Sequence, residues 1–188
     1  RTDYRVVWGN AIKRNYINAG FEENRIFVSG HPIYSKLKRS EIKLRSSLDN
    51  ILIITKNLWW GTPFSRNIYS ERSELLNYLL QVEIALKQLG VKKVRLRVHP
   101  SENISWYLRN VNNQFYLPDK ISNLKTSLDV STLVIGPTST VLIDSFFHNV
   151  NYIVFEPRDN RNLDYSGLPL VPPFDGSEKR IQVANNID

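Results

Sequence analysis

The feature that most constrains the fold is the stretch at residues 131–147, STLVIGPTSTVLIDSFF. A short apolar and largely β-branched run leads through a Gly-Pro-Thr-Ser-Thr turn into a segment with an apolar face at helical spacing. A strand that passes directly into a helix is a unit of an open α/β sheet. The hydroxyls of Thr138, Ser139 and Thr140 then lie where the helix begins, beside main-chain N–H groups that attract anions.

This turn has two interpretations. It suits a cradle for phosphate oxygens, in which the three hydroxyls donate hydrogen bonds and Gly136 lets the ligand approach the backbone closely. The same residues also suit an ordinary Ser/Thr helix cap, which contributes about 1 kcal/mol of stability and no function. The sequence of the turn leaves both interpretations open.

The rest of the chain predicts a Rossmann-like α/β fold, a mostly parallel sheet with flanking helices. The run at 51–55, ILIIT, is continuously apolar, which is typical of a parallel strand covered on both faces. We expect residues 1–48 to be the end of a preceding domain or a linker region, and residues 49–188 to be a Rossmann-like domain that binds a nucleotide-sugar donor. The expected strands are 4–8, 25–29, 51–55, 94–98, 133–135 and 151–155, and the expected helices are 11–19, 70–89, 102–109, 124–129, 141–147 and 177–185.

Composition excludes several kinds of protein. The 188 residues, 41% hydrophobic and 23% charged, have room for a sizeable core. The absence of cysteine excludes disulfides, thiolate metal sites and a cysteine nucleophile. Acidic residues are spread singly, so we expect no metal site. No apolar run is long enough to span a bilayer. Because the chain has no methionine and enters a strand almost at once, we expect it to be a piece of a longer protein.

The net charge of +7 favours anionic partners such as nucleotides, nucleic acids or membrane surfaces. A second anion-binding candidate is His99-Pro100, which follows the strand at 94–98 and so lies at the same sheet edge as the hydroxyl turn. Pro100 fixes the backbone and the imidazole can donate to a phosphate, although a lone histidine is more often structural. Lys56, Arg97 and Arg158, of which Arg158 lies just past the carboxyl end of a strand, are further candidates, and each suits a solvated surface charge as well as an anion contact.

Taken together, the opening Trp-Gly-Asn, the Gly-His-Pro at 30–32, His99-Pro100 and the Pro-Thr-Ser-Thr turn resemble the carboxyl-terminal, donor-binding half of bacterial GT-B glycosyltransferases. The resemblance is greatest to the sialyltransferase and polysialyltransferase group. In that group an HP motif and a Ser/Thr motif bind the phosphate and cytidine of a CMP-activated acidic sugar. The acid-base motif of the family, Asp/Glu-Asp/Glu-Gly, has no counterpart in a suitable place, because Asp175-Gly176 comes too late.

The resemblance implies an inverting, metal-independent transferase that moves a sialic-acid-like sugar from a CMP donor to a bacterial surface glycan of the O-antigen or capsule type. His99 would be the catalytic residue and would bond the donor phosphate. The general base would lie outside this chain. No cofactor is implied beyond the donor itself. The partners are the donor and a glycan acceptor, the location is cytoplasmic, and a peripheral contact with the inner membrane through the acceptor stays open. The residues implied in donor binding are Gly136, Pro100, Thr138, Ser139, Thr140, Lys56 and Arg158.

Other functions remain open. CDP-glycerol and ribitol-phosphate polymerases and CMP-Kdo transferases resemble the sequence almost as well, and all share a leaving cytidine phosphate whose charge must be stabilised. A sugar-nucleotide epimerase of the same architecture would carry a more Gly-rich turn. A basic nucleic-acid-binding module would use the charge and the Trp59-Trp60 loop for base stacking. We rank it lower and expect no nucleic-acid partner, because no nucleic-acid motif is present.

Overall fold

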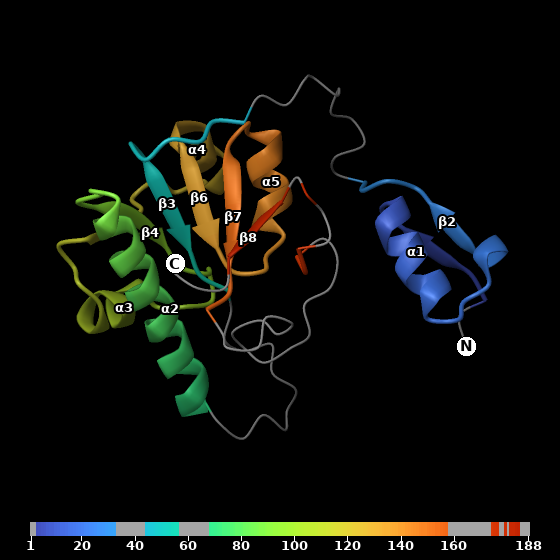
Figure 1. Cartoon of the computed structure of the whole chain (residues 1–188), viewed down its shortest axis with the longest axis horizontal. Coiled ribbons are helices and arrows are strands. Elements are labelled where there is room, and N and C mark those ends of the chain that lie inside the picture. The colour runs from blue at the N-terminus through green and yellow to red at the C-terminus, as the bar shows by residue number, and fades with distance from the viewer. Residues whose placement is uncertain are drawn as a thin grey trace. The chain divides into compact units, whose positions relative to one another are not determined.

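The computed structural model describes residues 3–32, 44–56, 68–157, 174–176, 179 and 181–184. The chain divides into two compact units, Arg1–Glu41 and Ile42–Asp188, which are drawn in Figure 1 and are treated separately below. The predicted roles of residues 1–48 and 49–188 stay predictions.

The first unit is a single strand-helix-strand element. β1 (Arg5–Val7) and β2 (Ile26–Val28) pair in parallel, and α1 (Asn10–Asn18) with the short 3-10 turn η1 (Glu23–Arg25) connects them. The Arg5 guanidinium lies over the rings of Tyr16 and Phe21, at 4.7 and 4.1 Å from their centres. Gly20 adopts a φ of +87°, which ends the helix as a C-terminal glycine commonly does.

The second unit is built on a six-stranded sheet in which all pairings are parallel, ordered β5-β4-β3-β6-β7-β8 (Figure 1). Counted from the first strand of the unit, this is the order 3-2-1-4-5-6 of the doubly wound nucleotide-binding fold. The predicted Rossmann-like α/β class is therefore confirmed. The strands are β3 (Ile51–Ile54), β4 (Val94–Arg97), β5 (Tyr116–Pro118), β6 (Leu133–Gly136), β7 (Asn151–Phe155) and β8 (Gln182–Ala184).

Four helices flank the sheet: α2 (Ile68–Gln88), α3 (Ile104–Asn110), α4 (Leu124–Val130) and α5 (Val141–Phe147). Asparagine side chains cap two of them. Asn103 accepts the N–H of Ser105 and Asn123 accepts that of Lys125, both at 2.9 Å. Such caps satisfy main-chain donors that a helix leaves unpaired at its start. No described helix combines the length and apolar character needed to cross a lipid bilayer.

The core lies on both faces of the sheet, and β3 divides its side chains between them. Ile51 and Ile53 join a cluster with α2 and α3, whereas Leu52 and Ile54 join a cluster with α4 and α5. Successive side chains of a strand point to opposite faces, so a strand covered on both sides must be apolar throughout. This is the physical reason for the uninterrupted run in the sequence.

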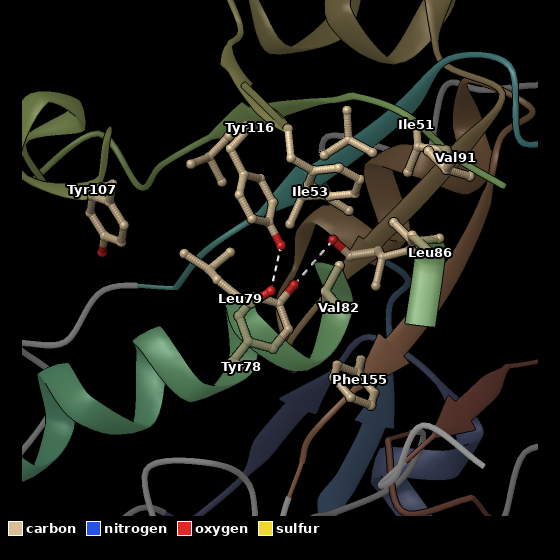
Figure 2. Packing of buried hydrophobic residues seen from close by; sticks show 14 of the residues in the cluster. Ile51, Ile53, Tyr78, Leu79, Val82, Leu86, Val91, Tyr107, Tyr116 and Phe155 are labelled. Carbon is tan, nitrogen blue, oxygen red and sulfur yellow. Dashed lines mark hydrogen bonds between the residues drawn. The ribbon is translucent and has the colours of Figure 1, made fainter. Parts of the chain in front are cut away.

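Two tyrosines of the first cluster, Tyr78 and Tyr116, have their hydroxyls hydrogen-bonded to main-chain oxygens (Figure 2). Tyr116 donates to the carbonyl of Leu79 at 2.5 Å, and Tyr78 lies 3.1 Å from the carbonyl of Ile54 and 3.3 Å from that of Ile135. Burial, with the nearby Glu83 carboxylate, raises the pKa of Tyr116. The ring therefore packs as a hydrophobic side chain while its hydroxyl stays protonated and bonded.

A buried carboxylate joins β4 to the segment after β5. Asp119 is fully buried and accepts hydrogen bonds from Arg95 at 3.1 Å, Arg97 at 2.8 Å and Ser127 at 2.6 Å. These donors come from a strand and from α4, so one side chain ties two layers together. The alternating arginines of β4 are thus partners of a single carboxylate.

The structure contradicts the predicted helix at 177–185. Residues 182–184 form the edge strand β8, which pairs with β7 so that Val154 faces Val183. Ile181 is buried in the second cluster. Partners far away in the sequence thus decided the conformation of this segment, since an open sheet edge offers hydrogen bonds that local helical propensity cannot match.

Candidate functional site

The candidate site is the carboxyl edge of the sheet between β3 and β6. These strands are neighbours, but the connection from β3 runs through α2 to β4 on one side while β6 continues through α5 to β7 on the other. In open α/β sheets, ligands bind in the crevice that forms where the strand order reverses in this way. The segments that end here carry Thr55 and Lys56 after β3, His99 after β4 and the turn at 137–140 after β6.

Packing explains the glycine at the end of β6. Gly136 is buried, and a methyl group at this position would collide with the side chain of Ile54 and the hydroxyl of Tyr152. The Tyr152 hydroxyl in turn donates to the carbonyl of Pro137 at 2.6 Å. Burial, then the proximity of Glu156, raises the pKa of Tyr152. Gly136 therefore has a structural reason to be glycine, and its predicted contact with a ligand stays a prediction.

A buried glutamate holds the next residue of the turn. The Thr138 N–H donates to Oε1 of Glu156 at 2.6 Å, and Glu156 is fully buried at the end of β7. One main-chain donor of the expected cradle is therefore already bonded inside the protein. The hydroxyl oxygen of Thr138 is buried and has no hydrogen-bond partner among the described residues.

Ser139 and Thr140 differ in what they do at the start of α5. Oγ of Ser139 accepts the N–H of Val141 at 3.2 Å, whereas Thr140 is exposed and its side chain makes no capping bond. Ser139 thus performs the capping role that the sequence also allowed. Because its oxygen is the acceptor, the Ser139 hydroxyl proton can still be donated to a ligand. The phosphate contacts of both residues stay predictions.

His99 is held in a tight turn. The Glu102 N–H donates to the His99 carbonyl at 2.8 Å, and Pro100 lies at the second position of the turn, where its fixed φ is favoured. The turn delays α3, which begins at Ile104, two residues after the predicted start. Across the sheet, the His99 N–H donates to Oγ1 of Thr55 at 3.1 Å. This hydrogen bond links the residue that follows β3 to the backbone of His99, close to the end of β4.

A further polar pair lies next to this junction. The buried Tyr107 hydroxyl donates to a carboxylate oxygen of Glu102 and also meets the hydroxyl of Thr55. Burial raises the pKa of Tyr107, the Glu102 carboxylate raises it further, and the bond from Thr55 opposes the rise only in part. Tyr107 therefore stays neutral and links the His99 turn to the strand end.

The structure places the three basic residues expected at the site differently. Lys56 lies two residues after the end of β3 and is partly buried at the sheet edge. Arg97 is engaged within the domain, because its terminal nitrogens donate to Asp119, to the Ile121 carbonyl at 2.6 Å and to the Ser122 carbonyl at 2.9 Å. Arg158 lies outside the described residues, as do Trp59 and Trp60. Among the described residues no group of acidic residues and histidines could hold a metal ion.

Among solved structures, the chain is similar to the wall teichoic acid polymerase TagF. The identity is 14% with a TM-score of 0.36, and the match covers 81% of this chain and 38% of the polymerase. A variant of that polymerase gives 14% identity and a TM-score of 0.35, with 82% and 40% covered. The chain thus spans about two fifths of the length of these polymerases, and a likeness of this size identifies neither donor nor reaction. No family model and no curated protein matches the chain.

Sequence reasoning missed three residues that shape the site. Thr55 reads as the last member of an apolar strand, yet its hydroxyl holds the His99 backbone. Ser101 lies two residues after His99 and contacts its ring at 2.8 Å, a spacing that could have been noticed in the sequence. Glu156 is the carboxylate that bonds the Thr138 N–H, and nothing local marks it, because the contact joins residues 18 apart.

Proposed function

We propose that residues 42–188 bind the nucleotide part of an activated donor at the β3–β6 crevice, and that the chain is the donor-binding half of a transferase that builds a bacterial surface glycan. The observation that supports the proposal is that the His99 turn after β4 and the Ser139 turn after β6 lie at the same carboxyl edge, on either side of β3, where the strand order reverses. This is the place in a doubly wound sheet where phosphates of nucleotides are bound.

The side chains at this crevice suit a leaving phosphate. When the bond between sugar and nucleotide breaks, negative charge develops on a phosphate oxygen, and prearranged hydrogen-bond donors stabilise it. His99 supplies a ring donor, Ser139 a hydroxyl and Lys56 a positive charge, from the ends of three neighbouring strands. Donors fixed to rigid strand ends need little rearrangement as the charge develops.

The donor that we propose is a CMP-activated, sialic-acid-like sugar, on the basis of the HP and Ser/Thr motifs. The CDP-activated polyols of wall and capsule synthesis are the alternative, and they differ from it in carrying a second phosphate. Both would leave a cytidine phosphate in the crevice. Because CMP is the leaving group in both reactions, CMP should bind in either case, and tighter binding of CDP than of CMP would favour the CDP-activated donor.

Calorimetric titration of the chain with CMP, CDP, UDP and ADP at one moderate salt concentration tests the proposal. Selective binding of CMP or CDP is expected. His99→Ala and Ser139→Ala should each weaken it by about 1 to 3 kcal/mol, roughly 5- to 150-fold, the usual cost of losing a charge-assisted hydrogen bond.

His148→Ala is the matched control. His148 lies at the carboxyl end of α5, where its ring contacts Asp129 at 2.6 Å, and α5 begins at the candidate site. This variant should bind cytidine nucleotides as the wild type does. Equal affinity for all four nucleotides, or unchanged affinity in a folded His99→Ala variant, would refute the assignment of the site.

A further inference from the structure

One ring nitrogen of His99, Nδ1, has hydrogen-bonding contacts within the protein. Nδ1 lies 3.3 Å from the main-chain nitrogen of Ser101 and 2.8 Å from its hydroxyl oxygen. A main-chain N–H can only donate a hydrogen bond, so this contact favours Nδ1 as an acceptor, and the Ser101 hydroxyl can donate to the same nitrogen. With Nδ1 as the acceptor, the neutral imidazole carries its single proton on Nε2.

The backbone around the ring is fixed as well. The His99 N–H is bonded to Thr55, and the His99 carbonyl accepts the N–H of Glu102 at 2.8 Å. Within the described part of the chain, Nε2 makes no hydrogen bond, and the side chain is partly exposed at the carboxyl edge of the sheet. A neutral histidine held in this way presents an N–H donor and needs no positive charge to do so.

We propose that Ser101 is a positioning residue for His99. Its main-chain N–H and its hydroxyl keep Nδ1 as the acceptor, so that Nε2–H is the donor offered to an oxygen of an anionic ligand. The contact with a ligand rests on the proposed function, whereas the protonation pattern of the ring and its dependence on Ser101 do not.

Nitrogen-15 NMR of the histidine rings tests the positioning directly. The chain has three histidines, His31, His99 and His148, so each ring can be assigned by substitution. The spectra are recorded while the pH is raised until the ring signals no longer change, and in them an unprotonated ring nitrogen resonates far downfield of a protonated one. We expect the downfield signal of His99 to come from Nδ1.

Ser101→Ala removes the shorter of the two contacts and keeps the main-chain N–H. The Nδ1 signal should then shift, and the signals of the two ring nitrogens should move toward each other as the second tautomer becomes populated. Ser101→Thr restores a hydroxyl and should restore the wild-type signals. A wild-type ring protonated on Nδ1, or signals that Ser101→Ala leaves unchanged, would overturn the proposal.

Titration with CMP and CDP provides the second measurement. Released from Ser101, the ring gains access to about three staggered χ1 positions in place of one, so Ser101→Ala should weaken binding about threefold. Ser105→Ala, an exposed serine on α3, is the matched control and should bind as the wild type does. If the wild type binds neither nucleotide, the proposed function fails while the NMR result still decides the role of Ser101. Normal binding by Ser101→Ala would refute its positioning role.

Discussion

Replacing Asp119 with asparagine should destabilise the folded protein strongly, because the Asp119 carboxylate accepts four hydrogen bonds. One carboxylate oxygen accepts from Arg95 and the Ile121 N–H, and the other accepts from Arg97 and Ser127. An amide can present oxygen at only one of these positions, so two donors lose their acceptor and two partly buried guanidinium groups lose their counter-charge. We expect a loss of about 2 to 4 kcal/mol at pH 7, below the roughly 3 to 5 kcal/mol for breaking a fully buried ion pair, because both guanidinium groups are partly exposed to solvent.

The direction in which the pKa of Asp119 is shifted determines how this loss of stability changes with pH. Burial alone would raise the pKa of Asp119, but the hydrogen bonds from Ser127, Arg97 and the Ile121 N–H, with the charge of Arg95, hold it below its usual value. A carboxyl whose pKa is lower in the folded state adds stability above its unfolded pKa of about 3.9, and that stability is lost as the pH falls through the folded pKa.

Urea unfolding of the full chain at pH 7, 5 and 3, followed by circular dichroism, measures both effects. The difference between wild type and Asp119→Asn should be constant from about pH 7 to pH 5 and shrink below about pH 4. Asp49→Asn is the control, because Asp49 is exposed and, among the described residues, accepts a hydrogen bond only from the Ser47 hydroxyl. A difference at pH 7 as small as that of the control, or one that does not change in acid, would refute the reasoning.

Three further changes test the packing of the site and its supports. Gly136→Ala should destabilise the protein by about 1 to 3 kcal/mol through overpacking against Ile54 and Tyr152, and Tyr152→Phe in the same chain should recover part of the loss in thermal melts. Tyr152→Phe alone should cost about 1 kcal/mol, because the Pro137 carbonyl loses its buried partner, and an unchanged melting temperature would argue against that bond. Asn123→Ala should remove about 1 kcal/mol by uncapping α4, whereas replacing the exposed Lys125 by alanine should change little in the same urea titration.

The sequence was most informative where local pattern and burial agree. β7 has the predicted bounds, and β3 and β4 each end one residue before the predicted end. β3 and β7 are short and mostly apolar, and β4 alternates apolar residues with arginine, so length, flanking turn residues and alternation together identify them as strands. The prediction that the hydroxyl turn follows a strand and precedes a helix was correct for the same reason.

Prediction failed where distant partners decide the outcome. The segment that contains β8 has a helix-like start, yet pairing with β7 makes residues 182–184 a strand. The bonds of Thr55 to His99 and of Glu156 to Thr138 join segments 44 and 18 residues apart, and no local pattern reports them. α3 starts two residues later than predicted because His99 and Pro100 lie in a separate turn and the side chain of Asn103 caps the helix.

The two edge strands of the sheet affect the tendency of the protein to aggregate at high concentration. The edge strands β5 and β8 have three residues each, and β5 ends at Pro118. The Asp119 N–H bonds Leu96 on β4, so the nitrogen of Pro118 faces the open side, where it has no hydrogen to offer. Long, flat and apolar edges recruit strands from other chains, and short edges interrupted by proline resist this. A sheet rich in isoleucine, leucine and valine is thus prevented from extending into intermolecular aggregates.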